Sequence, residues 1–160
     1  MAGCKIAVYT GLIKKLGDDA KLATVRSHEV AHAIARHAVE NCTRSFLELG
    51  ILRLYEYSLR GMVPRPVEFL IQTLHKYCLR LPRSRRMEIE ADRIGLLLLA
   101  AAGYDPSDAP SVWKKLGGNA GDWKLSNYVS NHPSFKKRAQ FVLQANVMEE
   151  ALKLYNESAS

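Results

Sequence analysis

Cysteine is scarce in this chain of 160 residues, and the few present follow no framework. The three cysteines, Cys4, Cys42 and Cys78, are odd in number and show no CxxC spacing. This usage argues for a reducing compartment or for simple packing in the core, and against a disulfide scaffold. Long apolar runs are also missing, since none approaches the ~20 residues of a membrane-spanning helix. Without repeats or low-complexity segments, the length suits one domain with a proper core.

Acidic residues are outnumbered, because 23 Lys and Arg stand against 16 Asp and Glu, a net charge of +7. Such an excess suits an anionic membrane surface, a nucleic acid or only a solvated face. The basic residues are scattered and lack interleaved aromatic residues, so we expect no nucleic-acid partner. Those considered are Arg83, Arg85, Arg86, Lys114, Lys115, Lys136, Lys137 and Arg138. Association with a membrane surface and oligomerisation stay open.

The N-terminus shows neither a signal peptide nor a transit peptide, since its first residues pass directly into a strand-like run. We expect a short strand over Lys5–Tyr9. A lone strand is unstable, so its partners must come from elsewhere, and we expect the chain to lack an upstream piece.

Apolar periodicity and breaker residues predict helices in the rest of the chain. The expected helices cover about 18–40, 46–59, 66–80, 85–102, a short segment from Asp105, and 133–154. Gly103 is expected to end the helix over 85–102, and residues 119–131 are expected to form a loop. The helices over 46–59 and 66–80 have wide apolar faces, so they either pack in the core or as a hairpin, or lie on a membrane.

The first predicted helix carries two histidines four residues apart, His28 and His32, with Glu29 directly after the first. A four-residue step returns to nearly the same helix face, so both imidazoles can reach one divalent metal ion. Glu29 points about 100° away from His28 and so stands beside the metal, where it can take a proton from an attacking water. His37 lies nine residues after His28, on the far side of a straight helix, and we interpret it as structural.

A catalytic metal needs a third protein ligand, and the candidate is Glu88. Asp92 lies four residues further on the same helix face, where it can accept the outer N–H of a ligating histidine. Glu90 points about 200° from Glu88 and is expected to meet solvent or a salt bridge. His132 precedes a proline at a predicted helix start, where it either caps the helix or stabilises an oxyanion.

These pieces together resemble a family of zinc metallopeptidases that includes HtpX-like proteases, CAAX prenyl endopeptidases and the Oma-type peptidases of the mitochondrial inner membrane. The matching stretches are 5–12, 27–37, 84–92, 102–106 and 131–134, followed by Arg138. Residues 84–106 look most similar to Oma-type proteins of plants. The family has a longer N-terminal region, whereas this chain begins just before the strand-like run, with Ala2-Gly3-Cys4 in place of a Pro-Gly-Gly-like turn.

The resemblance implies a role for each matching residue. It gives His28, His32 and Glu88 as ligands of one Zn²⁺ per chain and Glu29 as the general base. Asp92 would orient a ligand, His132 would act in the transition state or in control of the zinc site, and Arg138 would be a structural or substrate-side arginine. The strand would edge the cleft and pair with an extended substrate.

We therefore expect a single zincin-like α+β domain over 1–160, mostly α-helical with a short N-terminal edge strand. The expected function is zinc-dependent hydrolysis of peptide bonds in membrane-associated or misfolded proteins, as part of protein quality control. By resemblance alone, the location would be the mitochondrial inner membrane. The alternative is an inactive, shortened paralogue that contains zinc and binds client proteins.

Overall fold

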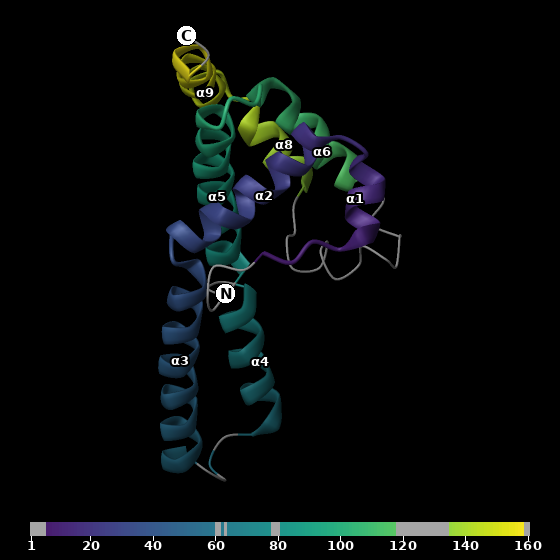
Figure 1. Ribbon diagram of the computed structural model, residues 1–160. Coiled ribbons are helices and arrows are strands. Elements are labelled where there is room, and N and C mark those ends of the chain that lie inside the picture. Colours follow the sequence, from purple (N-terminus) through teal and green to yellow (C-terminus); the bar gives the residue numbers. More distant parts are fainter. Residues whose placement is uncertain (1–5, 60–61, 63, 78–80, 118–134, 159–160) are drawn as a thin grey trace.

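The computed structural model describes residues 6–59, 62, 64–77, 81–117 and 135–158, and this part of the chain is built mainly from α-helices (Figure 1). The elements are α1 (Thr10–Leu16), α2 (Asp19–Ile34), α3 (His37–Leu59), α4 (Arg65–His75), α5 (Leu81–Ala101), the 3₁₀-helix η2 (Pro106–Asp108), α6 (Ala109–Gly117), α8 (Phe135–Val142) and α9 (Ala145–Ser158). The mostly helical character expected from the sequence is confirmed.

The N-terminal edge strand is not observed. Ile6–Tyr9 form no strand, and Tyr9 is the extended N-cap of α1, while Lys5 lies outside the described residues. A strand requires a neighbour to which it can hydrogen-bond, and the described residues provide none. The segment therefore leads into a helix at Thr10, where the sequence had indicated only the end of a strand.

The start of α2 follows the local signals in the sequence. Gly17 ends α1 with φ 66°, a left-handed conformation that glycine adopts readily. Asp18 is the N-cap of α2, and its Oδ1 accepts a hydrogen bond of 2.9 Å from the backbone N–H of Ala20. These two residues fix where the histidine-bearing helix begins.

The end of α2 differs from the prediction of one continuous helix to residue 40. The helix ends at Ile34, and Arg36 takes φ 55°, which is unusual for a residue other than glycine. A new helix, α3, then starts at His37. The turn brings the His37 ring against the His32 ring, a contact that a straight helix would prevent.

The centre of the body is α5, which packs against α2, α8 and α9 (Figure 1). Its C-terminal half is apolar, and it ends at Ala101, two residues before Gly103, whose φ is 79° and whose N–H donates to the Ala100 carbonyl at 2.9 Å. This helix stop was predicted correctly. The buried core joins these helices through Leu12, Leu16, Val25, Leu96, Leu99, Ala100, Ala109, Val112, Trp113, Leu116, Phe135, Ala139, Val142, Val147 and Ala151.

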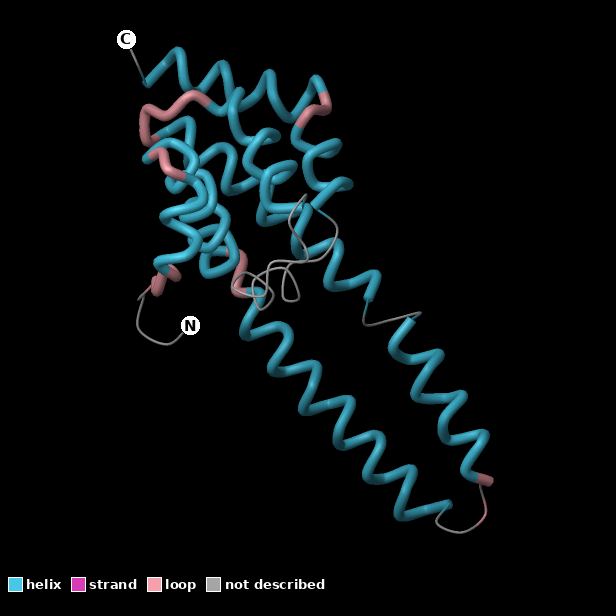
Figure 2. Tube along the Cα trace, turned by 90° about the vertical axis from the view of Figure 1, so that its right-hand side faces the viewer, coloured by secondary structure: helices cyan, strands magenta, loops and turns pink. Residues whose placement is uncertain are grey.

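Helices α3 and α4 form a hairpin that projects from the body, as Figure 2 shows in a view turned by 90°. Of the two packing arrangements predicted for these helices, the hairpin is observed, and packing in the core is not observed for α4, which has no buried residue. In the described part of the chain, no helix is both long enough and apolar enough to cross a bilayer.

The close approach of α2 to α5 depends on Gly95. A Cβ atom at this position would lie 3.0 Å from the His28 Cα and N atoms and 3.2 Å from the Ser27 carbonyl carbon. These are backbone atoms of α2, so the helices would have to separate to admit even one methyl group.

Gly95→Ala is therefore expected to destabilise the protein. Overpacking costs about 1–3 kcal/mol, which outweighs the about 0.5–1 kcal/mol that alanine gains over glycine inside a helix. Thermal unfolding followed by circular dichroism measures the change. Gly50→Ala in α3 is the matched control, since a Cβ there meets nothing within 4 Å, and its melting temperature should stay the same or rise. Equal effects of both substitutions would contradict this interpretation of Gly95.

Candidate metal centre

Three side chains from two helices converge where α2 crosses α5. The Nε2 atoms of His28 and His32 lie 3.0 Å apart, and each lies 3.4 Å from an oxygen of Glu88. His28 and Glu88 are buried, and His32 is partly buried. One donor atom from each residue lies within 4.8 Å of the other two, so the three can share one ion.

These spacings fit a zinc ion. Tetrahedral donors at zinc–ligand distances of about 2.0–2.1 Å lie roughly 3.3–3.4 Å from one another. The two imidazole nitrogens lie 3.0 Å apart, and each lies 3.4 Å from a different oxygen of Glu88, Oε2 for His28 and Oε1 for His32, so a small shift of the carboxylate would suit one shared ion. Two imidazoles and one carboxylate also form a donor set typical of catalytic zinc.

The two ring nitrogens of His28 have different surroundings, since Nε2 faces His32 and Glu88, with Arg138 Nη2 also 3.1 Å away, while Nδ1 faces a carboxylate. The His28 Nδ1 lies 3.0 Å from Asp92 Oδ1, and both side chains are buried. A carboxylate in this place fixes the tautomer and the orientation of a ligating ring. The structure thus brings Asp92 to the position expected from the sequence.

Arg138 of α8 contacts both buried acidic residues of the site, Asp92 and Glu88. Its Nε donates to Asp92 Oδ2 at 2.8 Å and its Nη2 to Asp92 Oδ1 at 2.6 Å, a two-pronged ion pair. Its Nη1 lies 3.2 Å from Glu88 Oε2, and its guanidinium lies 3.9 Å from the centre of the Trp113 ring. Arg138 is buried among the other polar side chains of the site.

These contacts shift the protonation of the buried groups. Burial favours the neutral form of His28, but its hydrogen bonds to Asp92 and Glu88 prevail and raise the pKa of His28 above its usual value. Burial likewise favours neutral Asp92, but Arg138 and His28 lower the pKa of Asp92. Asp92 therefore stays ionised between its two partners.

His37 has a closer relation to the site than the sequence indicated. Its Nδ1 lies 2.8 Å from His32 Nδ1, and its Nε2 lies 3.4 Å from Glu90 Oε2. With Nε2 of His32 kept for a metal, His32 donates from Nδ1 to His37, and His37 donates from Nε2 to Glu90. His37 is buried and holds the ring of His32, the candidate ligand, in place.

Two contributions were missed by sequence reasoning. His37 was placed on the far side because its helix was expected to be straight, and no signal in the sequence marks Arg36 as the turn. No sequence pattern marks Trp113, whose ring lies 5.2 Å from that of His28 and is fully buried. The expected salt-bridge role of Glu90 is consistent with its contact to His37.

The remaining candidates for catalytic roles are Glu29 and His132. Glu29 lies in α2 directly after His28 and is partly buried. His132 lies outside the described residues, so its predicted place near the site stays a prediction.

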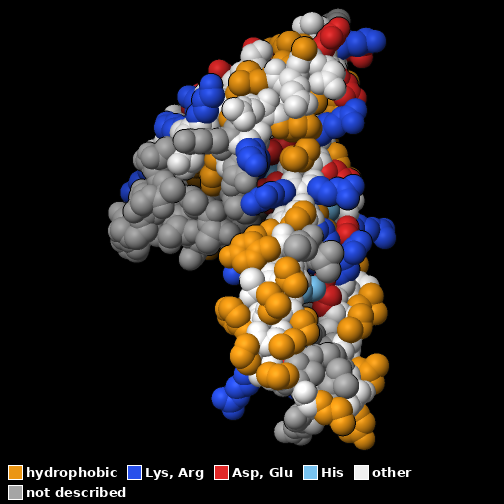
Figure 3. Space-filling view, turned by 180° about the vertical axis from the view of Figure 1, so that it is seen from behind, with side chains coloured by type: hydrophobic (Ala, Val, Ile, Leu, Met, Phe, Trp, Pro, Cys, Tyr) orange, Lys and Arg blue, Asp and Glu red, His pale blue; other side chains and the backbone are white. Residues whose placement is uncertain are grey.

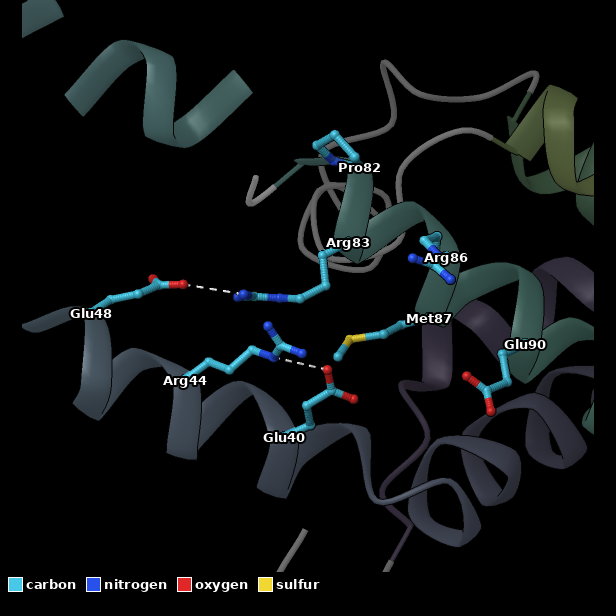
Figure 4. Close-up of a pocket in the computed structure, with 8 residues that line it drawn as sticks. All are labelled: Glu40, Arg44, Glu48, Pro82, Arg83, Arg86, Met87 and Glu90. Atoms are coloured by element: carbon cyan, nitrogen blue, oxygen red, sulfur yellow. Dashed lines mark hydrogen bonds and ion pairs between the residues drawn. The ribbon is translucent and has the colours of Figure 1, made fainter. Parts of the chain in front are cut away.

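A polar cleft of about 510 Å³ opens between α3 and α5 on the Glu90 side of the centre. Figure 4 shows its charged walls, where Arg83 reaches across to Glu48 at 3.1 Å and Arg44 pairs with Glu40 at 3.0 Å. The Arg83–Glu48 contact joins the middle of α3 to the start of α5.

The arrangement of two histidines and a distant glutamate around one ion-sized space is typical of metallopeptidases. The sequence of residues 1–146 matches peptidase family M48, and the chain belongs to this family.

The chain is similar to several curated proteins. It is 53% identical to a mitochondrial metalloendopeptidase OMA1 of Arabidopsis thaliana, over 96% of this chain and 30% of that protein. It is 33% identical to the protein of the same name from Schizosaccharomyces pombe, over 99% of this chain and 47% of that protein. The beta-barrel assembly-enhancing protease of Escherichia coli is 28% identical over 71% of the chain. The chain thus spans less than half the length of these relatives, and no solved structure matches it.

His37→Ala is expected to weaken zinc binding by about 10- to 100-fold, the usual effect of removing a group that orients a ligand. Competition with a chromogenic chelator measures the affinity. His75→Ala is the matched control, because His75 contacts Glu48 on the projecting hairpin and should leave the affinity unchanged. An unaltered affinity in His37→Ala would show that His32 is held without this contact.

Arg138→Met is expected to lower the free energy of unfolding by about 3–5 kcal/mol, because it leaves Asp92 charged and buried without its partner. Urea unfolding of the metal-free protein measures this loss. Lys137→Met alters the exposed neighbouring position and should stay within about 0.5 kcal/mol of the wild type. Similar values for the two variants would remove the structural role of Arg138.

Proposed function

We propose that this chain is a zinc-dependent endopeptidase domain in which His28, His32 and Glu88 hold one Zn²⁺. The observation that supports it best is the convergence of these three side chains, with one donor atom from each lying within 4.8 Å of the other two. Family membership supports the same reaction class, since the relatives are named metalloendopeptidases.

Zinc bound there supplies Lewis acidity, which polarises the scissile carbonyl and makes a water molecule more acidic. Glu29, beside His28 on α2, takes the proton of the attacking water and later passes it to the leaving amine. Asp92 keeps the His28 ring in place, and Arg138 keeps Asp92 ionised and oriented.

His132 is proposed to stabilise the oxyanion that forms when water attacks the peptide carbonyl. The support is its position before a proline in the sequence and the similarity of the stretch 131–134 to the family.

The proposed substrates are membrane-associated or misfolded proteins, and the proposed location is the mitochondrial inner membrane. The support is the name of the relatives, which are mitochondrial metalloendopeptidases from a plant and a yeast. The alternative of an inactive client-binding paralogue is not favoured, because the ligand set and the general base are all present in the chain.

Glu29→Gln tests the function. The variant should lose at least about 10²–10⁴-fold in the rate of hydrolysis of unfolded casein, since glutamine cannot accept the proton, while keeping one zinc per chain. Glu88→Gln is the companion variant and should lose both zinc and activity. Chelator-treated wild-type protein sets the background rate. Retained proteolysis by purified Glu29→Gln, at the wild-type rate, would refute the assignment.

A further inference from the structure

The projecting hairpin of α3 and α4 exposes an unusual number of large apolar side chains. They are Phe46, Leu47, Leu49, Ile51, Leu54, Tyr57, Val67, Phe69, Leu70, Ile71 and Leu74. Figure 3 shows apolar side chains covering the projecting part of the molecule. Contiguous exposed apolar surface of this kind marks a place where a protein meets another apolar surface.

The apolar side chains lie on more than one face of each helix. Leu49 and Ile51 are two residues apart and so point about 200° from each other on α3, yet they are 52% and 68% exposed. Val67 and Phe69 have the same relation on α4 and are 42% and 71% exposed. A flat protein partner covers one face of a helix, whereas fluid acyl chains can cover its sides as well.

The charge of the same region is basic. Among residues 36–90 whose side chains the structure describes, the exposed basic residues are Arg36, Arg44, Arg53, Arg65, Lys76, Arg85 and Arg86, and the exposed acidic ones are Glu40, Glu68 and Glu90. Basic side chains gather where the hairpin meets the body (Figure 3). An anionic lipid surface complements this charge, whereas a second copy of the chain would bring like charges together.

We propose that the α3–α4 hairpin docks on an anionic lipid bilayer and lies at the boundary between headgroups and acyl chains. A helix at this boundary sinks about 5–10 Å, which is comparable to its own diameter of about 10 Å, so its sides are covered together with its lower face. The arginine and lysine side chains reach up to the headgroup phosphates. In this arrangement the hairpin rests in one leaflet.

The position of the hairpin in the chain gives this docking a consequence for the site. The hairpin lies between His32 and Glu88, and the Arg83–Glu48 contact ties α3 to the helix that carries Glu88. Docking therefore holds the metal centre at a short, fixed distance from the lipid surface.

Vesicle flotation of the full chain tests the proposal. Vesicles of phosphatidylcholine are compared with vesicles that contain phosphatidylglycerol as well, and the Glu29→Gln chain is used so that the result is independent of proteolysis. Binding to the anionic vesicles should exceed binding to the neutral ones by about tenfold or more, and should fall when salt is raised to about 0.5 M.

Two double variants separate the hairpin from exposed apolar surface in general. Leu54→Gln with Phe69→Gln should reduce flotation by about tenfold or more, since both side chains are exposed on the hairpin. Ile13→Gln with Leu143→Gln is the matched control, because these exposed residues lie in α1 and just after α8, and it should float as the parent chain does. Circular dichroism checks that both variants keep their helices.

Several outcomes would overturn the proposal. They are the absence of flotation with either vesicle, equal loss in the two double variants, and flotation that ignores both lipid charge and salt. A concentration-dependent dimer in light scattering, abolished by the hairpin variant and without flotation, would assign the surface to a second copy of the chain instead. Zinc binding and casein hydrolysis are measured separately, so failure of lipid binding leaves the proposed reaction standing.

Discussion

The close contact between α2 and α5 is the constraint on which the rest of the structure depends. His28 and His32 belong to one helix and Glu88 to the other, so the three donor atoms meet only if the helix axes cross at short distance. Gly95 permits that distance because a side chain there would touch the backbone of α2. The apolar core on the far side of α5, with α8 and α9 packed against it, holds the crossing in place.

Buried charge is arranged around this crossing so that each group has a counterpart. Asp92 faces His28 on one side and Arg138 on the other, and Arg138 also approaches Glu88 and stacks over Trp113. Charges buried in this way rarely add stability beyond what apolar residues would give, but they orient the groups that they contact. The network is therefore better explained by the need to fix imidazole and carboxylate ligands than by stability of the fold.

The turn at Arg36 links the metal centre to the hairpin. It ends α2 one half-turn after His32, returns His37 to the His32 ring, and sends α3 away from the body. The same few residues thus complete the support of a ligand and set the direction of the apolar arm. A polar cleft separates the first half of α3 from the start of α5 (Figure 4).

The sequence alone predicted the proposed ligands, the start of α2, the end of α5 and the helical character of the described part of the chain, because these depend on residues close together. The four-residue spacings of His28 with His32 and of Glu88 with Asp92 are helix geometry. It could not determine the place of His37 or the depth of Arg138. The place of His37 depends on a backbone turn at Arg36 that no residue type predicts. The depth of Arg138 depends on packing between segments 46 residues apart. The strand over Lys5–Tyr9 was wrongly expected for Ile6–Tyr9, since strand formation depends on a neighbour that a local pattern cannot supply. The tertiary structure decided these points because contacts distant in sequence outweigh local preference.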